Sequence, residues 1–364
     1  MLNVRAFIRP EISQSVDGPH RQHKYRARGV SCQRRAFVCL QSSPGPPSLR
    51  SGDFGVCKSV GGYGMKVAPD AARPCAGGRL GSVRSVRMKV SIATYAYHGL
   101  LEQGLMDIFG CLESVRFRHD LRAVDIWNGF TPDEQAFDPA FQANVRRSLD
   151  ERELVHANYC VDGCHVWWPA ADERAHARKV AMRQLQAGVA MGARTVRIDA
   201  GGKGTQWSDE QFDTIAATMR EFAQFAHDNG IKAGPESHWG PELVPDNMER
   251  LAKAVDHPGF GILIHLGHWE GVSSDEGDRR LAPWCMHTHV DAQTTETRLA
   301  DAIAILQKAG YDGYWGVEHH TGRNEYAEVA YQVAAVQRAL ADIACDEPLR
   351  EPKLREPGGM PDHI

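Results

Sequence analysis

The sequence contains no run of 18 or more apolar residues, so we expect no membrane-spanning helix. No secretory signal opens the chain, and its nine cysteines include no Cys-x-x-Cys pair. These absences disfavour a secreted disulfide scaffold and a zinc ribbon, and they favour a cytoplasmic protein with free thiols. The 42% apolar and 24% charged composition is typical of a globular protein.

Acidic residues are scarce in the first 87 positions, which carry 15 Lys and Arg but only 4 Asp and Glu, a balance of +11. The remainder carries 27 basic and 42 acidic residues, a balance of −15. Residues 1–87 also show no sustained hydrophobic period and are rich in proline and glycine, so we expect a leader without a fold. A targeting segment and a basic binding arm are the alternatives. Met88 is a natural start for the folded part, and residues 346–364 are expected to form a C-terminal tail.

Short apolar strands alternate with amphipathic helices from residue 88 onward. Strands and their loops are predicted around residues 88–99, 121–130, 152–163, 193–202, 231–240, 259–269, 283–292 and 311–322. Helices are predicted near 100–116, 138–149, 172–192, 208–230, 245–255, 295–309 and 324–343, with a short or missing one after the sixth strand. The helix from 208 has a capping box, Ser208 with Gln211.

Eight strand–helix units in residues 88–345 predict an α/β fold, a (β/α)8 TIM barrel. The competing fold is a doubly wound open sheet. That fold usually has fewer strands and a glycine-rich phosphate loop after the first strand, and the stretch "ATYAYHGLLEQG" is not such a loop. We therefore favour the barrel.

Carboxylates and imidazoles gather where the last four predicted strands end, which is where barrel enzymes place their catalytic groups. Seven of the 17 histidines fall in these four segments. The polar residues at the strand ends are Glu236 and His238, then His265 and His268, then His287, His289 and Asp291, and finally Glu318, His319 and His320. Such side chains are the ligand set of a divalent transition metal.

These motifs resemble the xylose-isomerase-like barrels of sugar (phosphate) isomerases and epimerases, over about residues 88–345. In that family a Glu, an Asp, a His and a Glu at the ends of strands five to eight bind one divalent ion. Glu236 in "GPESHWG", His289 in "HTHVDA" and Glu318 in "WGVEHH" match three of the four. The usual Asp-x-x-His of strand six is His265-Leu-Gly-His268 here, so an imidazole stands where the family has a carboxylate.

The resemblance implies that Glu236, His265, His289 and Glu318 are the metal ligands. Two Glu and two His carry one negative charge fewer than the usual set, which favours Mn²⁺, Zn²⁺, Fe²⁺ or Co²⁺ over Mg²⁺. The alternative is that the metal is displaced or lost. Glu236 and Glu318 would also act as acid and base on a sugar, keto-sugar or polyol-derived ketone, through a metal-bound cis-enediolate. Candidate substrate-binding residues at the strand ends are His268, His238, His320, Arg197, Trp127 and Trp239.

Other functions stay open at this point. A dehydratase of inosose type shares the barrel, because an enediolate with a β-leaving group loses water. A degenerate barrel that serves as a partner subunit is the non-catalytic alternative, and the strand-end residues would then be ion-pair partners and packed histidines. An apurinic-site nuclease needs three zinc ions and more ligands, and a balance of −15 repels DNA phosphates. We expect a sugar-like substrate and no nucleic acid or membrane partner. The chain is also a candidate homo-oligomer.

Overall fold

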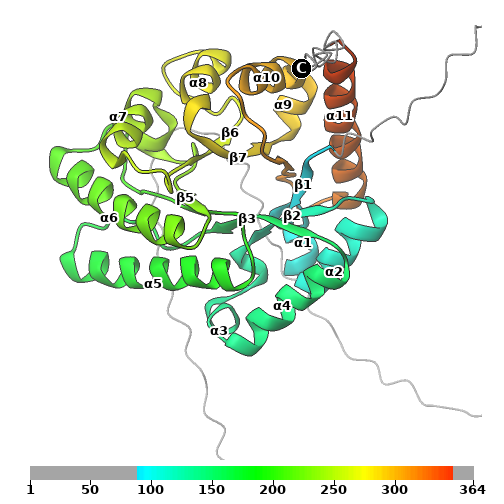
Figure 1. Cartoon of the computed structure of the whole chain (residues 1–364), viewed down its shortest axis with the longest axis horizontal. Coiled ribbons are helices and arrows are strands. Elements are labelled where there is room, and N and C mark those ends of the chain that lie inside the picture. The colour runs from blue at the N-terminus through cyan, green and yellow to red at the C-terminus, as the bar shows by residue number, and fades with distance from the viewer. Residues whose placement is uncertain (1–87, 347–364) are drawn as a thin grey trace, which may run out of the picture. The chain divides into compact units, whose positions relative to one another are not determined.

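The computed structural model describes residues 88–346. Eight parallel strands run in the order β5-β4-β3-β2-β1-β8-β7-β6. Two isolated bridges, Ala233 with Phe260 and Glu236 with Leu263, join the remaining edges of β5 and β6. The predicted barrel is therefore confirmed (Figure 1). The strands are β1 (Val90–Ala93), β2 (Ala123–Trp127), β3 (Val155–Val161), β4 (Thr195–Ile198), β5 (Lys232–Gly234), β6 (Ile262–His265), β7 (Cys285–Val290) and β8 (Trp315–Val317).

Helices surround the strands on the outside of the barrel (Figure 1). They are α1 (His98–Glu102), α2 (Ile108–Glu113), α3 (Asp133–Ala136), α4 (Pro139–Glu151), α5 (Ala171–Ala190), α6 (Asp209–Asp228), α7 (Pro245–Val255), α8 (Ser274–Leu281), α9 (Ala292–Thr297), α10 (Leu299–Lys308) and α11 (Glu325–Asp346). The predicted leader, residues 1–87, and nearly all of the predicted tail lie outside the described residues. Within residues 88–346, no helix has the length and apolar character needed to cross a membrane.

The predicted helix from residue 208 is confirmed, whereas the prediction of a single helix near 100–116 is wrong. The Ser208 side chain accepts from the Gln211 backbone N–H, and the Gln211 side chain accepts from the Ser208 N–H, so α6 begins with the predicted capping box. The single helix expected near 100–116 is divided into α1 and α2. Gly104 has a φ of 67° and ends the first turn, and the Asp107 side chain caps the second helix. The helix after β6 is short, as expected, with 8 residues.

Apolar side chains between the strands and the helices form the core. Ile215, Met219 and Phe222 lie on the buried face of α6, and Ile92 on β1 and Ile126 on β2 are fully buried. Polar side chains are concentrated at the C-terminal strand ends, inside the barrel mouth. Core packing thus fixes the strands, and the strands position the polar groups.

One buried histidine outside the barrel mouth makes stability depend on pH. His156 on β3 is 2% exposed, and burial lowers its pKa to about 4 from an ordinary 6.5. The unfolded chain binds a proton at His156 below pH 6.5, whereas the folded chain does not until about pH 4. This contribution to stability is therefore present above pH 6.5 and is lost as the pH falls to 4. We expect a loss of about 3 kcal/mol over that window.

Urea unfolding of wild type and His156→Leu at pH 7, 5.5 and 4 measures this effect. The variant, which has no imidazole at this position, should lose less stability between pH 7 and 4 than the wild type. His176→Leu, at an exposed position on α5, is the matched control and should keep the wild-type slope. Equal slopes for His156→Leu and wild type would contradict the prediction.

Candidate functional site

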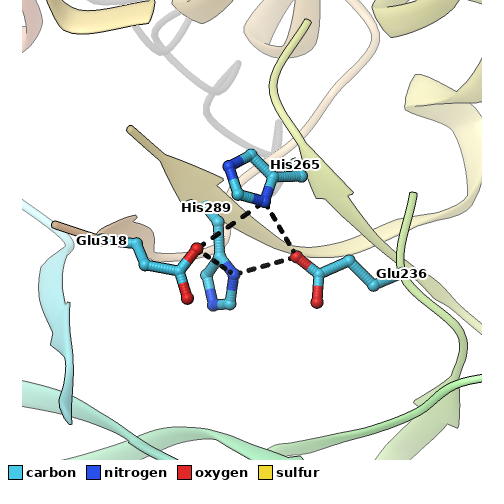
Figure 2. A group of neighbouring side chains, drawn as sticks. All are labelled: Glu236, His265, His289 and Glu318. Atoms are coloured by element: carbon cyan, nitrogen blue, oxygen red, sulfur yellow. Dashed lines mark hydrogen bonds and ion pairs between the residues drawn. The ribbon is translucent and has the colours of Figure 1, made fainter. Parts of the chain in front are cut away.

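Four buried side chains from four neighbouring strands meet at one point in the barrel mouth (Figure 2). Glu236 follows β5, His265 ends β6, His289 lies on β7 and Glu318 directly follows β8. Each offers one oxygen or nitrogen atom, and these four atoms all lie within 4.8 Å of one another. The structure thus brings together all four predicted metal ligands, including His265 at the family's aspartate position.

The donor atoms are spaced as a small coordination site requires. Glu236 Oε1 lies 3.1 Å from His265 Nδ1 and 3.0 Å from His289 Nδ1. Glu318 Oε2 lies 3.2 Å from His289 Nδ1 and 3.6 Å from His265 Nδ1. Ligand bonds of roughly 2.1 Å in a tetrahedral site place neighbouring donors about 3.4 Å apart. The two glutamates and two imidazoles therefore fit one divalent transition ion in both chemistry and spacing.

Asp125 on β2 fixes the orientation of the His289 ring. Its Oδ2 lies 2.8 Å from His289 Nε2 and 2.9 Å from His287 Nε2, and its Oδ1 accepts from Asn158 Nδ2 at 3.0 Å. With Nε2 of His289 engaged by this carboxylate, Nδ1 is the nitrogen that faces the other donors. Gly316 on β8 makes room for the two rings, because a Cβ there would lie 3.0 Å from His287 Nε2 and 2.6 Å from the Thr288 carbonyl oxygen.

Opposite charges keep both glutamates ionised despite their burial. Burial opposes ionisation of Glu236, but His238, His289 and Arg197 outweigh it and hold its pKa well below the usual value. Burial likewise opposes charge on Glu318, and His289 and His320 hold its pKa well below the usual value. Burial disfavours a charge on His289, yet Glu318, Glu236 and Asp125 raise its pKa well above 6.5. The site is therefore strongly ionic at neutral pH.

Arg197 at the end of β4 is the main buried cation beside the cluster, with its side chain 3% exposed. Its Nε lies 2.9 Å from Glu236 Oε2, and its Nη1 lies 2.6 Å from Asp162 Oδ1 and 3.0 Å from Asp199 Oδ2. The guanidinium therefore contacts one oxygen of Glu236, while the other oxygen points at the two imidazoles. Burial lowers the pKa of Arg197, but these carboxylates raise it by more, so the pKa lies above its usual value.

A cavity of about 330 Å³ lies over the donor cluster. Glu318 and His265 are part of its wall, whereas Glu236, at 1% exposure, lies behind them. Tyr95 and Asp162 also line it. The structure places all six predicted substrate-binding residues on this wall, namely His268, His238, His320, Arg197, Trp127 and Trp239. Their role in binding stays a prediction.

Acidic side chains lie beside the three wall histidines. His268 Nε2 lies 3.1 Å from Asp291 Oδ2, and its ring stacks on His265 with centroids 3.7 Å apart. His320 Nε2 lies 2.9 Å from Glu318 Oε2, and His238 Nδ1 lies 3.5 Å from Asp199 Oδ2. Hydrogen bonds thus fix the His268 and His320 rings, whereas the buried Nδ1 of His238 has no hydrogen-bond partner within the described residues. His319 is directed elsewhere, toward the Arg323 carbonyl oxygen.

Asp125 and Tyr95 belong to the site, and sequence analysis missed both. Asp125 is a lone carboxylate inside the apolar strand "AVDIW". An unpaired charge in a buried strand is energetically costly, so its presence there could have indicated a buried partner. Its partners His287 and His289 are more than 160 positions away in the chain, so their pairing depends on the barrel. Tyr95 lies in the 3-10 helix Thr94–Tyr97 that follows β1, next to Trp127, with ring centroids 5.0 Å apart. Nothing in its local sequence marks it.

A comparison with known families now places the chain. Residues 117–340 match the model of the xylose isomerase-like TIM barrel family, and the chain belongs to that family. No curated protein sequence matches it.

Solved structures share the barrel at low identity. An L-ribulose 3-epimerase is 12% identical with a TM-score of 0.57, covering 73% of this chain and 100% of its own. The 3-keto-D-glucoside 4-epimerase from E. coli is 15% identical with a TM-score of 0.55, covering 69% and 99%. A probable 3-DHS dehydratase from Bacillus anthracis is 14% identical with a TM-score of 0.55, also covering 69% and 99%. At these identities the likeness establishes the fold.

Proposed function

We propose that the protein is a divalent-metal-dependent isomerase or epimerase acting on a sugar or keto-sugar. The observation that carries the proposal is the position of two carboxylates, Glu236 and Glu318, on opposite sides of the His265 and His289 rings (Figure 2). Neighbouring positive charges hold the pKa of each carboxyl well below its usual value. The cluster lies at the floor of a cavity of about 330 Å³, a volume suited to one small polyol. Two of the structural neighbours are named as sugar epimerases, which supports the same reaction class.

Glu236, His265, His289 and Glu318 would hold the ion. When bound, it polarises a substrate carbonyl and makes the neighbouring C–H more acidic. Mn²⁺, Zn²⁺, Fe²⁺ and Co²⁺ suit this set of two carboxylates and two imidazoles better than Mg²⁺ does. His265 presents Nδ1 to the cluster, 3.1 Å from Glu236 Oε1, and its buried Nε2 has no hydrogen-bond partner within the described residues.

The two glutamates share the proton transfers. Glu318 lines the cavity and takes the proton from the carbon beside the carbonyl, while His320 at 2.9 Å stabilises its ionised form before transfer. Glu236, on the other side of the cluster with Arg197 at its second oxygen, would take a proton from solvent water and give it to the opposite face, while Glu318 releases the abstracted proton to water, so that the proton count balances. Return to the opposite face of the same carbon inverts that centre, whereas return to the adjacent carbon interconverts aldose and ketose. Trp127 and Trp239 cover apolar C–H faces of the sugar.

Exchange of the α-proton with solvent tests this function. Full-length protein loaded with Mn²⁺ or Co²⁺ is incubated in D₂O with ketohexoses, keto-glucosides and inososes. NMR and mass spectrometry should show deuterium at the carbon beside the carbonyl and formation of an epimer or isomer. A product that has lost water would instead identify a dehydratase. The proposal is overturned if no compound that binds the protein exchanges a C–H proton.

Replacement of Asp125 by Asn should weaken metal binding by about 10- to 100-fold. The amide keeps the size of the side chain but no longer balances the charge of the His289 ring or fixes its tautomer. Calorimetric titration of EDTA-treated protein with Zn²⁺ and Mn²⁺ measures the effect. Asp150→Asn, on the surface of α4, is the control and should bind as wild type does. Unchanged affinity in Asp125→Asn would remove Asp125 from the site.

Replacement of His265 by Asp should shift the metal preference. The variant restores the usual carboxylate of the family and adds one negative charge to the donor set, which favours the harder ions. We expect affinity for Mg²⁺ and Mn²⁺ to rise relative to Zn²⁺, measured by competition titration. His268→Asp, three positions later on the cavity wall, changes the same residue type outside the four-donor cluster and should leave the preference unchanged. An unaltered preference in His265→Asp would mean that His265 does not contact the ion.

A further inference from the structure

A second cavity, of about 560 Å³, adjoins the catalytic cavity at the C-terminal end of the barrel. Residues from the C-terminal ends of β3, β4 and β5 and the segments that follow them line both cavities. The segment after β3 supplies Asp162 to the first cavity and Trp168 to the second, and β4 supplies Arg197 to the first while its following loop supplies Lys203 to the second. Trp239, after β5, lines both cavities and is 51% exposed. One indole therefore forms the boundary between them.

The aromatic side chains of the second cavity are already fixed by protein contacts. Trp168 Nε1 donates to the His165 carbonyl oxygen at 2.9 Å, and Trp239 Nε1 donates to Asp199 Oδ2 at 3.0 Å. The Arg174 guanidinium lies 4.6 Å from the Trp167 ring centroid. Since the indole N–H groups of Trp168 and Trp239 are satisfied, what these rings offer to a ligand is their flat apolar face. Such faces match the C–H surface of a sugar ring.

The polar groups of this cavity do not select a charged ligand. Lys203 and Glu173 both line it, and their charges are opposite. The other polar side chains are His165 and Gln211, and because Gln211 Oε1 accepts from the Ser208 N–H, its amide N–H groups are what remain for a ligand. Apolar faces with a few donors and acceptors, and one side chain of each charge, are the environment of an uncharged, hydroxyl-rich ring.

We infer that the substrate has two rings and is a glycoside of a keto-sugar: the reacting ring lies over the donor cluster and the second, uncharged sugar ring lies against Trp168 and Trp239. The inference rests on the proposed function and names its substrate class. The catalytic cavity, at about 330 Å³, is near the lower limit of roughly 300 Å³ for ligand pockets and is filled by one ring. A monosaccharide would leave the adjoining aromatic cavity unused.

Two probes test the inference, the methyl glycoside of a 3-keto-glucose and the matching 3-keto-disaccharide. Calorimetry measures their binding to full-length protein, and deuterium exchange in D₂O measures turnover. We expect the disaccharide to bind at least 10-fold more tightly than the methyl glycoside. Trp168→Ala should remove that difference while leaving the methyl glycoside within 2-fold of wild type in both assays. Tyr331→Ala, another large exposed aromatic residue, on α11, is the control and should change neither.

The possible failures are distinguishable. Preferential binding of the disaccharide that is lost in Trp168→Ala, without exchange of either probe, would support the second-ring site and overturn the proposed function. Exchange of both probes with equal affinity, unaffected by Trp168→Ala, would overturn the inference and leave the function standing. A change of oligomeric state in Trp168→Ala on ultracentrifugation, with unchanged affinity for the disaccharide, would identify the cavity as a contact between copies of the chain and would also overturn the inference.

Discussion

Glu318→Gln is expected to lower the rate of α-proton exchange by roughly 10²- to 10⁴-fold, the range that a positioned general base contributes. Glu318 is the member of the carboxylate pair that lines the cavity, and its pKa is held well below the usual value, so it is ionised and within reach of substrate. An amide has the same shape but cannot accept a proton. Because its carbonyl oxygen can still contact an ion, the variant should lose exchange more completely than it loses metal.

Two measurements separate the base from the ligand. Metal affinity and exchange rate are determined on the same preparations of wild type, Glu318→Gln and Glu236→Gln. Glu296→Gln, at an exposed position on α9, controls for the chemistry of the substitution and should behave as wild type. If Glu318→Gln loses exchange only in proportion to its loss of bound metal, Glu318 is a ligand without a role as base.

Arg197→Met is expected to cost about 3–5 kcal/mol of folding stability at pH 7. The guanidinium is the cation between Asp162, Asp199 and Glu236, and the last two are buried, at 2% and 1% exposure. Methionine retains the length and packing of the side chain and removes its charge. The ionised carboxylates then repel one another without a counter-charge.

The pH dependence identifies the cause of that loss. Burial raises the pKa of Asp199 and of Glu236, but Arg197 and the nearby histidines hold each below its usual value in the wild type. Without Arg197 the effect of burial is less opposed, so these carboxylates should take up protons at a higher pH in the variant than in the wild type, and protonation relieves their repulsion. The cost of Arg197→Met should therefore be greatest at pH 7 and shrink toward pH 4, and adding Asp199→Asn should restore part of the stability. Arg147→Met, at an exposed ion pair on α4, should change stability by less than about 0.5 kcal/mol. A cost independent of pH would point to packing instead.

The barrel and the gathering of strand-end carboxylates and imidazoles were predictable because both follow from local patterns, and the family resemblance then selected the four donors among them. Alternation of strand and helix indicated eight units, and parallel strands in a barrel bring their C-terminal ends together, so Glu236, His265, His289 and Glu318 were placed at one mouth before their distances were known. The capping box at Ser208 was predictable for the same reason, since it depends on residues three positions apart.

Contacts between distant segments were not predictable in this way. The pairing of Asp125 with His289 depends on how β2 and β7 face each other across the barrel, and no local period encodes that relation. The second cavity depends on the path of two irregular segments, which place Trp168 and Lys203 on the same wall. The division of the helix near 100–116 was marked by Gly104 and Asp107, but the helical period around them concealed it.

The most direct test of the account is the amount of divalent metal that the full-length protein holds. Protein stripped with EDTA, incubated with Mn²⁺, Co²⁺ or Zn²⁺ and then desalted is analysed by elemental mass spectrometry, beside the double variant Glu236→Ala/Glu318→Ala. The account predicts about one ion per chain in wild type and almost none in the double variant, because the variant removes both carboxylates of the cluster. A wild type that retains none of the three metals, or a double variant that retains as much as wild type, would contradict it.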